Sequence, residues 1–317
     1  MQYAPIALFV YNRPAHIRQV VSALQKNYLA GDSELIIFSD APRDMGQRDG
    51  VEEVRRYIKL IQGYKKITVI QRDSHFGLSH SIISGVTEVI SRYGKIIVLE
   101  DDLVTSPYFL QFMNDALALY ENEEKVISVC GYMYPLRKKY ADTSFLRIAD
   151  CWGWATWKRG WDLFVANGKG LYVDLKAKKL FKAFNLDGAS NYTGMLEAQI
   201  QGRNDSWAVR WYASAFLRGK LSLYPRKSLV MNIGFDGSGR HGGANDYFRT
   251  EILNEPIAVH RIPVFEDERL ITEVGSYLKK QRFNIGHKTL EFFRKKWYNQ
   301  KLNKGRVNGH EYNQDNK

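Results

Sequence analysis

The chain of 317 residues is 44% hydrophobic and 13% aromatic, enough apolar material for a sizeable core, which excludes an intrinsically disordered protein. Two cysteines are too few for a disulfide scaffold, and both lie in apolar or aromatic stretches typical of a core. No run of about 18 apolar residues predicts a membrane-spanning helix, and the N-terminus lacks the regions of a signal peptide, so we expect a cytoplasmic protein.

The first half of the chain alternates short β-rich runs with helical periodicity, which predicts a mostly parallel sheet wrapped by helices. We expect strands at residues 6–11, 35–38, 67–70, 96–99 and 126–130. Apolar stripes predict helices around residues 17–24, 54–61, 78–90 and 109–120. Ser106 and Pro107 are suited to the N-cap and first position of the last of these helices.

Most of the net charge of +12 is a C-terminal feature, since residues 279–306 contain ten Lys or Arg and one Glu. Leu290, Phe293 and Trp297 recur there at helical spacing. The segment is therefore either an amphipathic helix on the anionic inner face of a membrane or a solvated terminal helix. Nucleic-acid binding is a third interpretation, which no recognition motif supports, and we expect no nucleic-acid partner.

Charged residues follow the expected strands at the sheet edge where open α/β proteins bind ligands. They are Arg13, Asp40, Arg72 and the triplet Glu100-Asp101-Asp102. Adjacent carboxylates repel one another unless a cation or hydrogen-bond donors compensate them. Mg²⁺ or Mn²⁺ binds one or two carboxylates and takes its other ligands from water and a diphosphate. The triplet thus predicts a metal and diphosphate site, although polymerases, nucleases and phosphatases have similar strand ends.

Glycine-rich phosphate loops are missing after the first expected strand, which argues against P-loop NTPases and dinucleotide oxidoreductases. Read alone, Arg13 is equally well a surface residue before a helix, and Asp40 a turn former.

Five blocks of the sequence occur in an order that resembles inverting GT-A glycosyltransferases. They are residues 7–14, residues 97–109, Cys151-Trp152-Gly153-Trp154, Asp205-Ser206-Trp207 and Gly237-Ser238-Gly239-Arg240-His241. The likeness is to N-acetylglucosaminyltransferase I and to family-2-like transferases of bacterial polysaccharide synthesis. It implies a GT-A, Rossmann-like fold with a mostly parallel twisted sheet flanked by helices, and the composition adds a helical, basic C-terminal tail. Residues 1–125 would form the donor half, 126–265 the acceptor and catalytic half of the same domain, and 266–317 a basic extension.

The resemblance also implies roles for the charged residues. Asp102 would bind the Mn²⁺ or Mg²⁺ that bridges the donor phosphates, while Glu100 and Asp101 would contact the sugar and ribose. Arg13 and Asp40 would face the nucleotide, and Arg72 would lie nearby. His241 would approach the metal or diphosphate, with Arg240 beside it on the diphosphate. A lone His in a glycine-rich segment is otherwise exposed or structural.

Inverting transfer needs a base that deprotonates the acceptor hydroxyl. The resemblance implies Asp205, although the family carries Asp-Asp-Trp where this chain has Asp205-Ser206-Trp207. The competing interpretation is that Asn204, Asp205 or Ser206 caps the helix that follows. Asp150 and Asp162 are second-rank candidates for the base.

Four tryptophans lie within ten residues, at 152, 154, 157 and 161. Aromatic rings stack on sugar rings, so Trp152 and Trp154 are expected to form an acceptor or sugar wall, with core packing as the competing explanation.

The expected function is transfer of a sugar from a UDP-sugar to a glycan acceptor such as a lipid-linked oligosaccharide. The setting would be bacterial surface polysaccharide or lipopolysaccharide synthesis, with peripheral membrane contact through the basic tail. A sugar-phosphate nucleotidyltransferase is the competing enzyme, but its Gly-rich basic loop after strand one is missing. A non-catalytic carbohydrate-binding or polyanion-binding protein is the third possibility.

Overall fold

Four parallel strands form the N-terminal part of the sheet in the computed structural model, which describes residues 2–237 and 248–281. In spatial order they are β3 (Lys66–Gln71), β2 (Glu34–Ser39), β1 (Ile6–Val10) and β4 (Lys95–Glu100). The strands β1, β2 and β4 are almost wholly buried because helices cover both faces, whereas β3 at the edge is partly exposed. All four predicted strands are therefore confirmed to within one or two residues.

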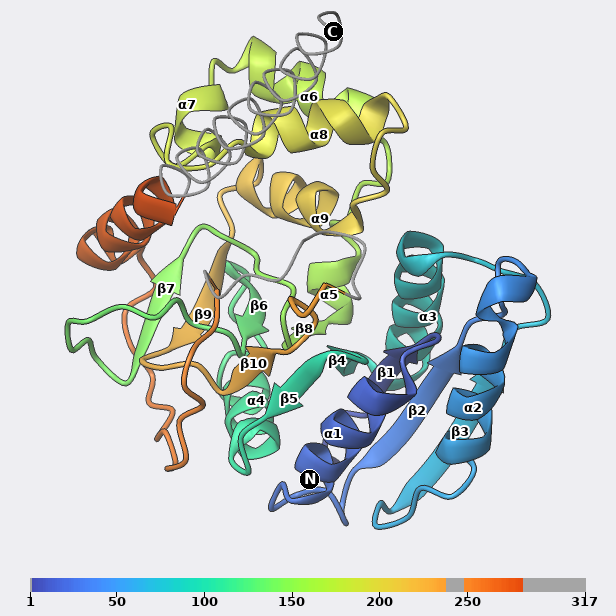
Figure 1. Ribbon diagram of the computed structural model, residues 1–317. Helices are drawn as coiled ribbons and strands as arrows, with labels where there is room; N and C mark the ends of the chain where they lie inside the picture. Colours follow the sequence, from blue (N-terminus) through green and yellow to red (C-terminus); the bar gives the residue numbers. More distant parts are fainter. Residues whose placement is uncertain (1, 238–247, 282–317) are drawn as a thin grey trace, which may run out of the picture.

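Helices pack on both faces of these strands (Figure 1). They are α1 (Pro14–Gln25), α2 (Arg48–Ile58), α3 (Leu78–Tyr93) and α4 (Phe109–Leu119), with a short 3₁₀ helix, η1 (Met45–Gln47), before α2. Alternate strand residues face opposite sides. Leu8 packs in the cluster that contains the apolar faces of α1, α2 and α4, and Phe9 packs in the cluster that contains α3.

The second half of the chain extends the same sheet. Beyond β4 the order is β8 (Trp154–Trp157), β6 (Val126–Cys130), β9 (Leu221–Pro225) and β7 (Thr143–Leu146). Strand β8 runs antiparallel to both of its neighbours, and β7 runs antiparallel to β9, while β6 and β9 are parallel. The expected mixed α/β architecture with a mostly parallel sheet flanked by helices is thus confirmed.

A group of helices lies on the α3 side of this second half (Figure 1). It comprises α5 (Lys158–Trp161), α6 (Gly168–Ala177), α7 (Phe181–Phe184), α8 (Tyr192–Ile200) and α9 (Trp207–Phe216). Residues 268–281 are also helical and pack through Leu270, Val274 and Leu278 in a smaller core with Leu186.

The start of α4 differs from the sequence prediction. The helix begins at Phe109, so Ser106 is not its N-cap. The Ser106 hydroxyl donates instead to the carbonyl oxygen of Leu253 at 2.6 Å and accepts from the Tyr108 N–H at 3.2 Å. The serine therefore ties the chain before α4 to a distant segment, a partner that local sequence does not reveal.

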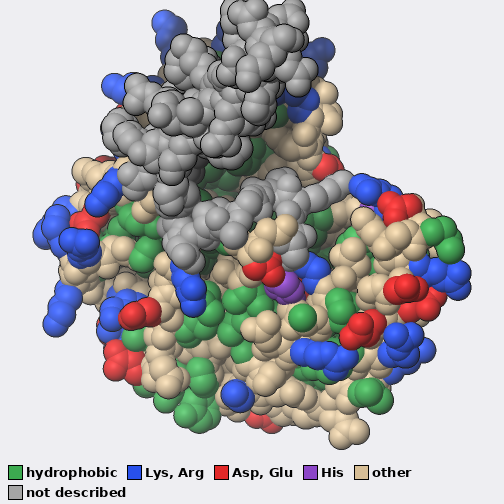
Figure 2. Space-filling model, viewed as in Figure 1, with side chains coloured by type: hydrophobic (Ala, Val, Ile, Leu, Met, Phe, Trp, Pro, Cys, Tyr) green, Lys and Arg blue, Asp and Glu red, His purple; other side chains and the backbone are tan. Residues whose placement is uncertain are grey.

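Charged side chains of both signs are mixed on the face that Figure 2 shows, and over α2 and its neighbours positive groups lie beside negative ones. There Arg18 pairs with Glu53 at 3.2 Å and Arg48 with Glu52 at 2.7 Å. The amphipathic pattern of Leu290, Phe293 and Trp297 lies outside the described residues. Within residues 2–237 and 248–281, no helix combines the length and apolar character required to span a bilayer.

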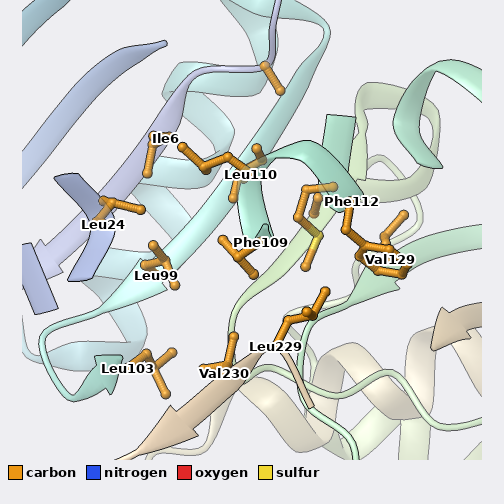
Figure 3. Close-up of a cluster of buried hydrophobic side chains, with 14 of the residues drawn as sticks. Ile6, Leu24, Leu99, Leu103, Phe109, Leu110, Phe112, Val129, Leu229 and Val230 are labelled. Atoms are coloured by element: carbon orange, nitrogen blue, oxygen red, sulfur yellow. The ribbon is translucent and has the colours of Figure 1, made fainter. Parts of the chain in front are cut away.

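A two-stranded ribbon leads the chain away from the end of β4. It pairs β5 (Leu103–Thr105) with β10 (Val230–Asn232) in antiparallel register. Figure 3 shows Leu99 of β4, Phe109 of α4 and Val230 of β10 meeting in one apolar cluster. A Cβ at Gly131 would lie 2.7 Å from the Phe109 ring and 2.9 Å from a Val230 methyl, so this packing requires glycine. The ribbon is thereby fixed beside the acidic triplet.

Candidate active site

A cleft of about 1120 Å³ opens where β1, β2 and β4 end. Its floor contains residues 11–13 and 100–102, and one wall comes from the loops that follow β2 and β3. Another wall comes from residues 202–205, between α8 and α9, and from the segment after β10. Strand order reverses at β1, because β2 and β3 lie on one side of it and β4 on the other. Such a switch point is where open α/β sheets bind ligands.

Arg13 is the counter-charge of the acidic triplet. Its guanidinium forms ion pairs with the carboxylates of Asp101 and, at 3.0 Å, Asp102. The Tyr11 N–H donates a second hydrogen bond to Asp101 at 3.1 Å. Burial by itself lowers the pKa of Arg13, but the two aspartates outweigh burial and raise that pKa above its ordinary value. The structure therefore favours an inward, site-forming Arg13 over a surface residue.

One guanidinium faces three carboxyl groups. Burial, followed by repulsion from Asp102 and Asp101, raises the pKa of Glu100 to about 8. Burial also raises the pKa of Asp101, although Arg13 acts in the opposite direction. The site therefore has more acidic groups than nearby cations, and a bound cation would relieve their repulsion.

The backbone after β10 closes over Asp102. The Ile233 N–H donates to the Asp102 carbonyl oxygen at 2.9 Å, and Gly234 follows directly. A Cβ at Gly234 would clash with a carboxylate oxygen of Asp102 and lie 3.1 Å from the Arg13 guanidinium. Glycine at this position thus allows the main chain to approach the ion pair.

The donor set fits a cation that is shared with a ligand. Across the described residues, no group of three or more His, Cys, Asp or Glu could hold a metal ion by itself. A hard divalent cation held jointly with a diphosphate needs only one or two carboxylates, which Asp102 and its neighbours provide. His241 and Arg240, the other expected ligands of metal and diphosphate, lie outside the described residues.

Asp40 lines the cleft, but both oxygens of its carboxylate already have partners within the protein. One oxygen accepts from the N–H groups of Ala41 at 2.9 Å and Phe76 at 2.8 Å. The other accepts from the Gly77 N–H at 2.9 Å and lies 3.0 Å from His75 Nδ1. The side chain joins the loops after β2 and β3, so the turn-forming interpretation accounts for both of its oxygens.

Arg72 is not among the residues that line the cleft. Its guanidinium lies over the rings of Phe38, at 5.4 Å, and Phe76, at 4.8 Å, and is 3.9 Å from Glu88. Aromatic faces attract a cation. The two rings and Glu88, which belongs to α3, therefore hold Arg72 at the β3 edge of the sheet.

The two tryptophans that were expected to form a sugar wall, Trp152 and Trp154, lie in different environments. Trp152 lines the cleft, where its ring meets those of Tyr132 and Phe235 at centroid distances of 4.7 and 5.5 Å. Trp154 is completely buried and packs against Trp161, Trp207 and Trp211. The prediction that Trp154 contacts a sugar is wrong, because it belongs to the central strand β8 and points into the core under α9.

Asp205 lines the cleft just before α9. The N-cap of α9 is Ser206, whose hydroxyl accepts from the Val209 N–H at 3.3 Å. The capping role therefore belongs to Ser206, which leaves the Asp205 carboxylate available: its side chain is 57% exposed and lies 3.8 Å from Arg210. Asp162 pairs with Lys158 at 2.7 Å, away from the cleft lining.

Several residues of the cleft were not identified from the sequence. Tyr11 donates its hydroxyl hydrogen to Gln47 and accepts from the Arg43 N–H at 3.0 Å, which joins the end of β1 to the chain after β2. Tyr11 directly follows a strand, so the strand-end rule could have found it. No predicted strand end points to Asn232 and Gly234, because β10 has only three residues and is defined only by its pairing with β5.

Asp150 is two residues before Trp152 and is not among the residues that line the cleft. Its carboxylate accepts from the Trp152 N–H at 2.9 Å, and burial raises its pKa from the ordinary 3.8 to about 6. The folded state thus holds this proton more tightly than the unfolded chain. The resulting stabilisation is complete below the ordinary pKa and is lost as pH rises through the folded pKa.

Replacement of Asp150 by Asn is expected to stabilise the protein relative to wild type at pH 8 but not at pH 4. The amide keeps an acceptor for Trp152 and cannot ionise, and a shift of about two pKa units corresponds to roughly 2–3 kcal/mol. Urea denaturation at both pH values measures this difference, with Asp162→Asn as the exposed control. A difference that does not change with pH would contradict the assignment.

No family model matches the chain, and no curated protein matches it in sequence. Among solved structures it is similar to the mannosyltransferase PcManGT from Pyrobaculum calidifontis, in complex with GDP-Man and Mn²⁺, with 12% identity and a TM-score of 0.38. That similarity covers 68% of this chain and 70% of the other. S. aureus TarS 1-349 gives 11% identity and a TM-score of 0.40 over 71% of this chain and 59% of that chain.

Proposed function

We propose that the chain is a glycosyltransferase that moves a sugar from a nucleotide-sugar to a hydroxyl group of a glycan. The observation that carries this proposal is the acidic triplet, paired with Arg13, on the floor of the cleft between β1 and β4. A cleft of about 1120 Å³ exceeds the usual size of a single ligand pocket, so it has room for a donor and part of an acceptor.

Asp102 is the proposed ligand of Mn²⁺ or Mg²⁺. The Asp101 side chain is 5% exposed and bonds to both Tyr11 and Arg13, whereas that of Asp102 is 15% exposed and faces the cleft. A bound divalent cation would neutralise charge on the departing diphosphate. Arg13 holds the two aspartates in place, and Glu100 and Asp101 are proposed to contact the sugar and ribose.

Asp205 is the proposed base. It lies on the α8–α9 connection, a different wall from the triplet, and its exposed carboxylate can reach an acceptor hydroxyl in the cleft. Trp152, which also lines the cleft, is proposed to stack on a sugar ring. Residues 1–125 would then serve the donor and 126–265 the acceptor.

We further propose a UDP-sugar donor, inversion at the anomeric carbon, and a lipid-linked acceptor in bacterial surface polysaccharide synthesis. These three assignments are supported by the order of the sequence blocks. The competing nucleotidyltransferase normally has a basic Gly-rich loop after the first strand, where this chain has Tyr11-Asn12-Arg13-Pro14. Polyanion binding in the cleft is disfavoured by its acidic floor.

The proposal is tested by calorimetry of the full chain with a panel of UDP- and GDP-sugars, in Mn²⁺ and in excess EDTA. We expect one donor to bind at least about tenfold more tightly with Mn²⁺, because the cation joins Asp102 to the diphosphate. Release of nucleoside diphosphate with glycan acceptors then identifies transfer. Asp162→Asn should match wild type. Equal binding in Mn²⁺ and EDTA, or no binding by any donor, would refute the proposal.

A further inference from the structure

Arg210 is a buried cation behind the cleft. Its side chain is 8% exposed and projects from the first turns of α9. A guanidinium out of water is costly unless its donors and charge are matched. Each of its three nitrogens donates one hydrogen bond: to the Ser79 hydroxyl at 2.6 Å and to the carbonyl oxygens of Ala166 and Ser206 at 3.1 and 3.2 Å.

The charge of Arg210 has one carboxylate partner among the described residues, Asp205, at 3.8 Å. Asp205 is on a connection with no helix or strand of its own, and its side chain is 57% exposed. Without a fixed partner such a carboxylate would sample several rotamers. The Arg210 guanidinium is itself held by three hydrogen bonds, so its positive charge gives the Asp205 carboxylate a preferred position.

The same guanidinium links two walls of the cleft. Ser79 is in the first turn of α3, next to Gly77 and Leu78, which line the cleft on the side of Asp40. Ser206 follows Asp205 on the other wall. The hydrogen bonds from Arg210 to both serines therefore fix the distance between the proposed donor side and the proposed base.

We propose, given the transferase function above, that Arg210 is a positioning residue that holds the Asp205 carboxylate toward the acceptor and ties it to the donor wall through Ser79. During transfer the acceptor oxygen bonds to the anomeric carbon and its proton passes to Asp205. The bond from that carbon to the diphosphate breaks, and its electron pair leaves on the diphosphate. Arg210 is unchanged and acts through the location of Asp205.

Replacement of Arg210 by Met is expected to lower kcat about 30-fold while the donor Kd changes less than about threefold, as for loss of a transition-state interaction. Arg210→Lys keeps the charge and should recover part of the loss. Ser79→Ala removes one anchor and should lower kcat about threefold in a stable protein. The matched control is Arg218→Met, just beyond α9, where the guanidinium bonds to the Ser214 carbonyl oxygen at 3.1 Å.

A double-mutant cycle with Asp205→Asn separates positioning from a merely structural role. If Arg210 acts through Asp205, then Arg210→Met and Ser79→Ala cause no further loss of kcat once Asp205 is replaced. If wild type transfers sugar but the loss of kcat in the double variants is the product of the single losses, the positioning role of Arg210 is wrong while the proposed function stands. Equal losses for Lys and Met at position 210 would likewise overturn the positioning role. No transfer by wild type would instead refute the proposed function, and the base role of Asp205 with it.

Discussion

Replacement of Asp102 by Asn is expected to lower kcat/KM for sugar transfer about 1000-fold, roughly 4 kcal/mol of transition-state stabilisation. The amide removes the charge that would hold the cation against the donor diphosphate. Calorimetry of the variant should show the same donor affinity in Mn²⁺ and in EDTA. The fold should persist, because an amide oxygen still accepts from Arg13 and the Ile233 N–H bonds to the main chain of residue 102.

Thermal unfolding of Asp102→Asn provides the control for this experiment. A Tm close to that of wild type means that lost activity reflects the site and not the fold. The substitution also removes repulsion between Asp102 and Glu100, which raises the pKa of Glu100 in the wild type, and this relief favours the folded state. If the variant still binds donor more tightly in Mn²⁺ than in EDTA, Asp102 is not the metal ligand.

Replacement of Asp205 by Asn is expected to lower kcat by about two to three orders of magnitude and to leave donor affinity within about twofold, as for loss of a general base. The N-cap of α9 is Ser206, so the helix keeps its start. Single-turnover transfer with saturating acceptor measures the chemical step, and calorimetry measures the donor.

Asp150→Asn is the comparison for the base assignment. The Asp150 carboxylate accepts from the Trp152 N–H but is not among the residues that line the cleft, so its variant should retain transfer. Loss of transfer in Asp150→Asn together with normal transfer in Asp205→Asn would reverse the assignment. A collapse of donor binding in Asp205→Asn would place that residue in the donor site instead.

The strands that the sequence predicted are those buried on both faces or followed by clear helical stripes. The runs around Leu8, Ile36 and Val98 are apolar throughout because helices cover both sides, and that property is local. Strand β8 is different: Trp154 and Trp157 pack in different clusters, so its sequence looks like an aromatic group with no period.

The candidate site was predictable where it follows a strand end. Arg13 and the triplet follow β1 and β4, and parallel strands bring their carboxyl ends to one edge. The satisfied carboxylate of Asp40 was not predictable, because its partners are backbone N–H groups of another loop. The link from Arg210 to Ser79 was also hidden, since 131 residues separate its two ends in the chain.

Strand β8 limits how the molecule can change shape. It follows β6 and β7 in the chain but lies between β4 and β6 and bonds to both, so one hydrogen-bonded ladder crosses from the first half of the chain to the second. A hinge between the halves would break that ladder and leave unpaired backbone groups on both edges. Adaptation to ligands of different size must therefore come from the connections around the cleft, while the sheet beneath remains a rigid platform.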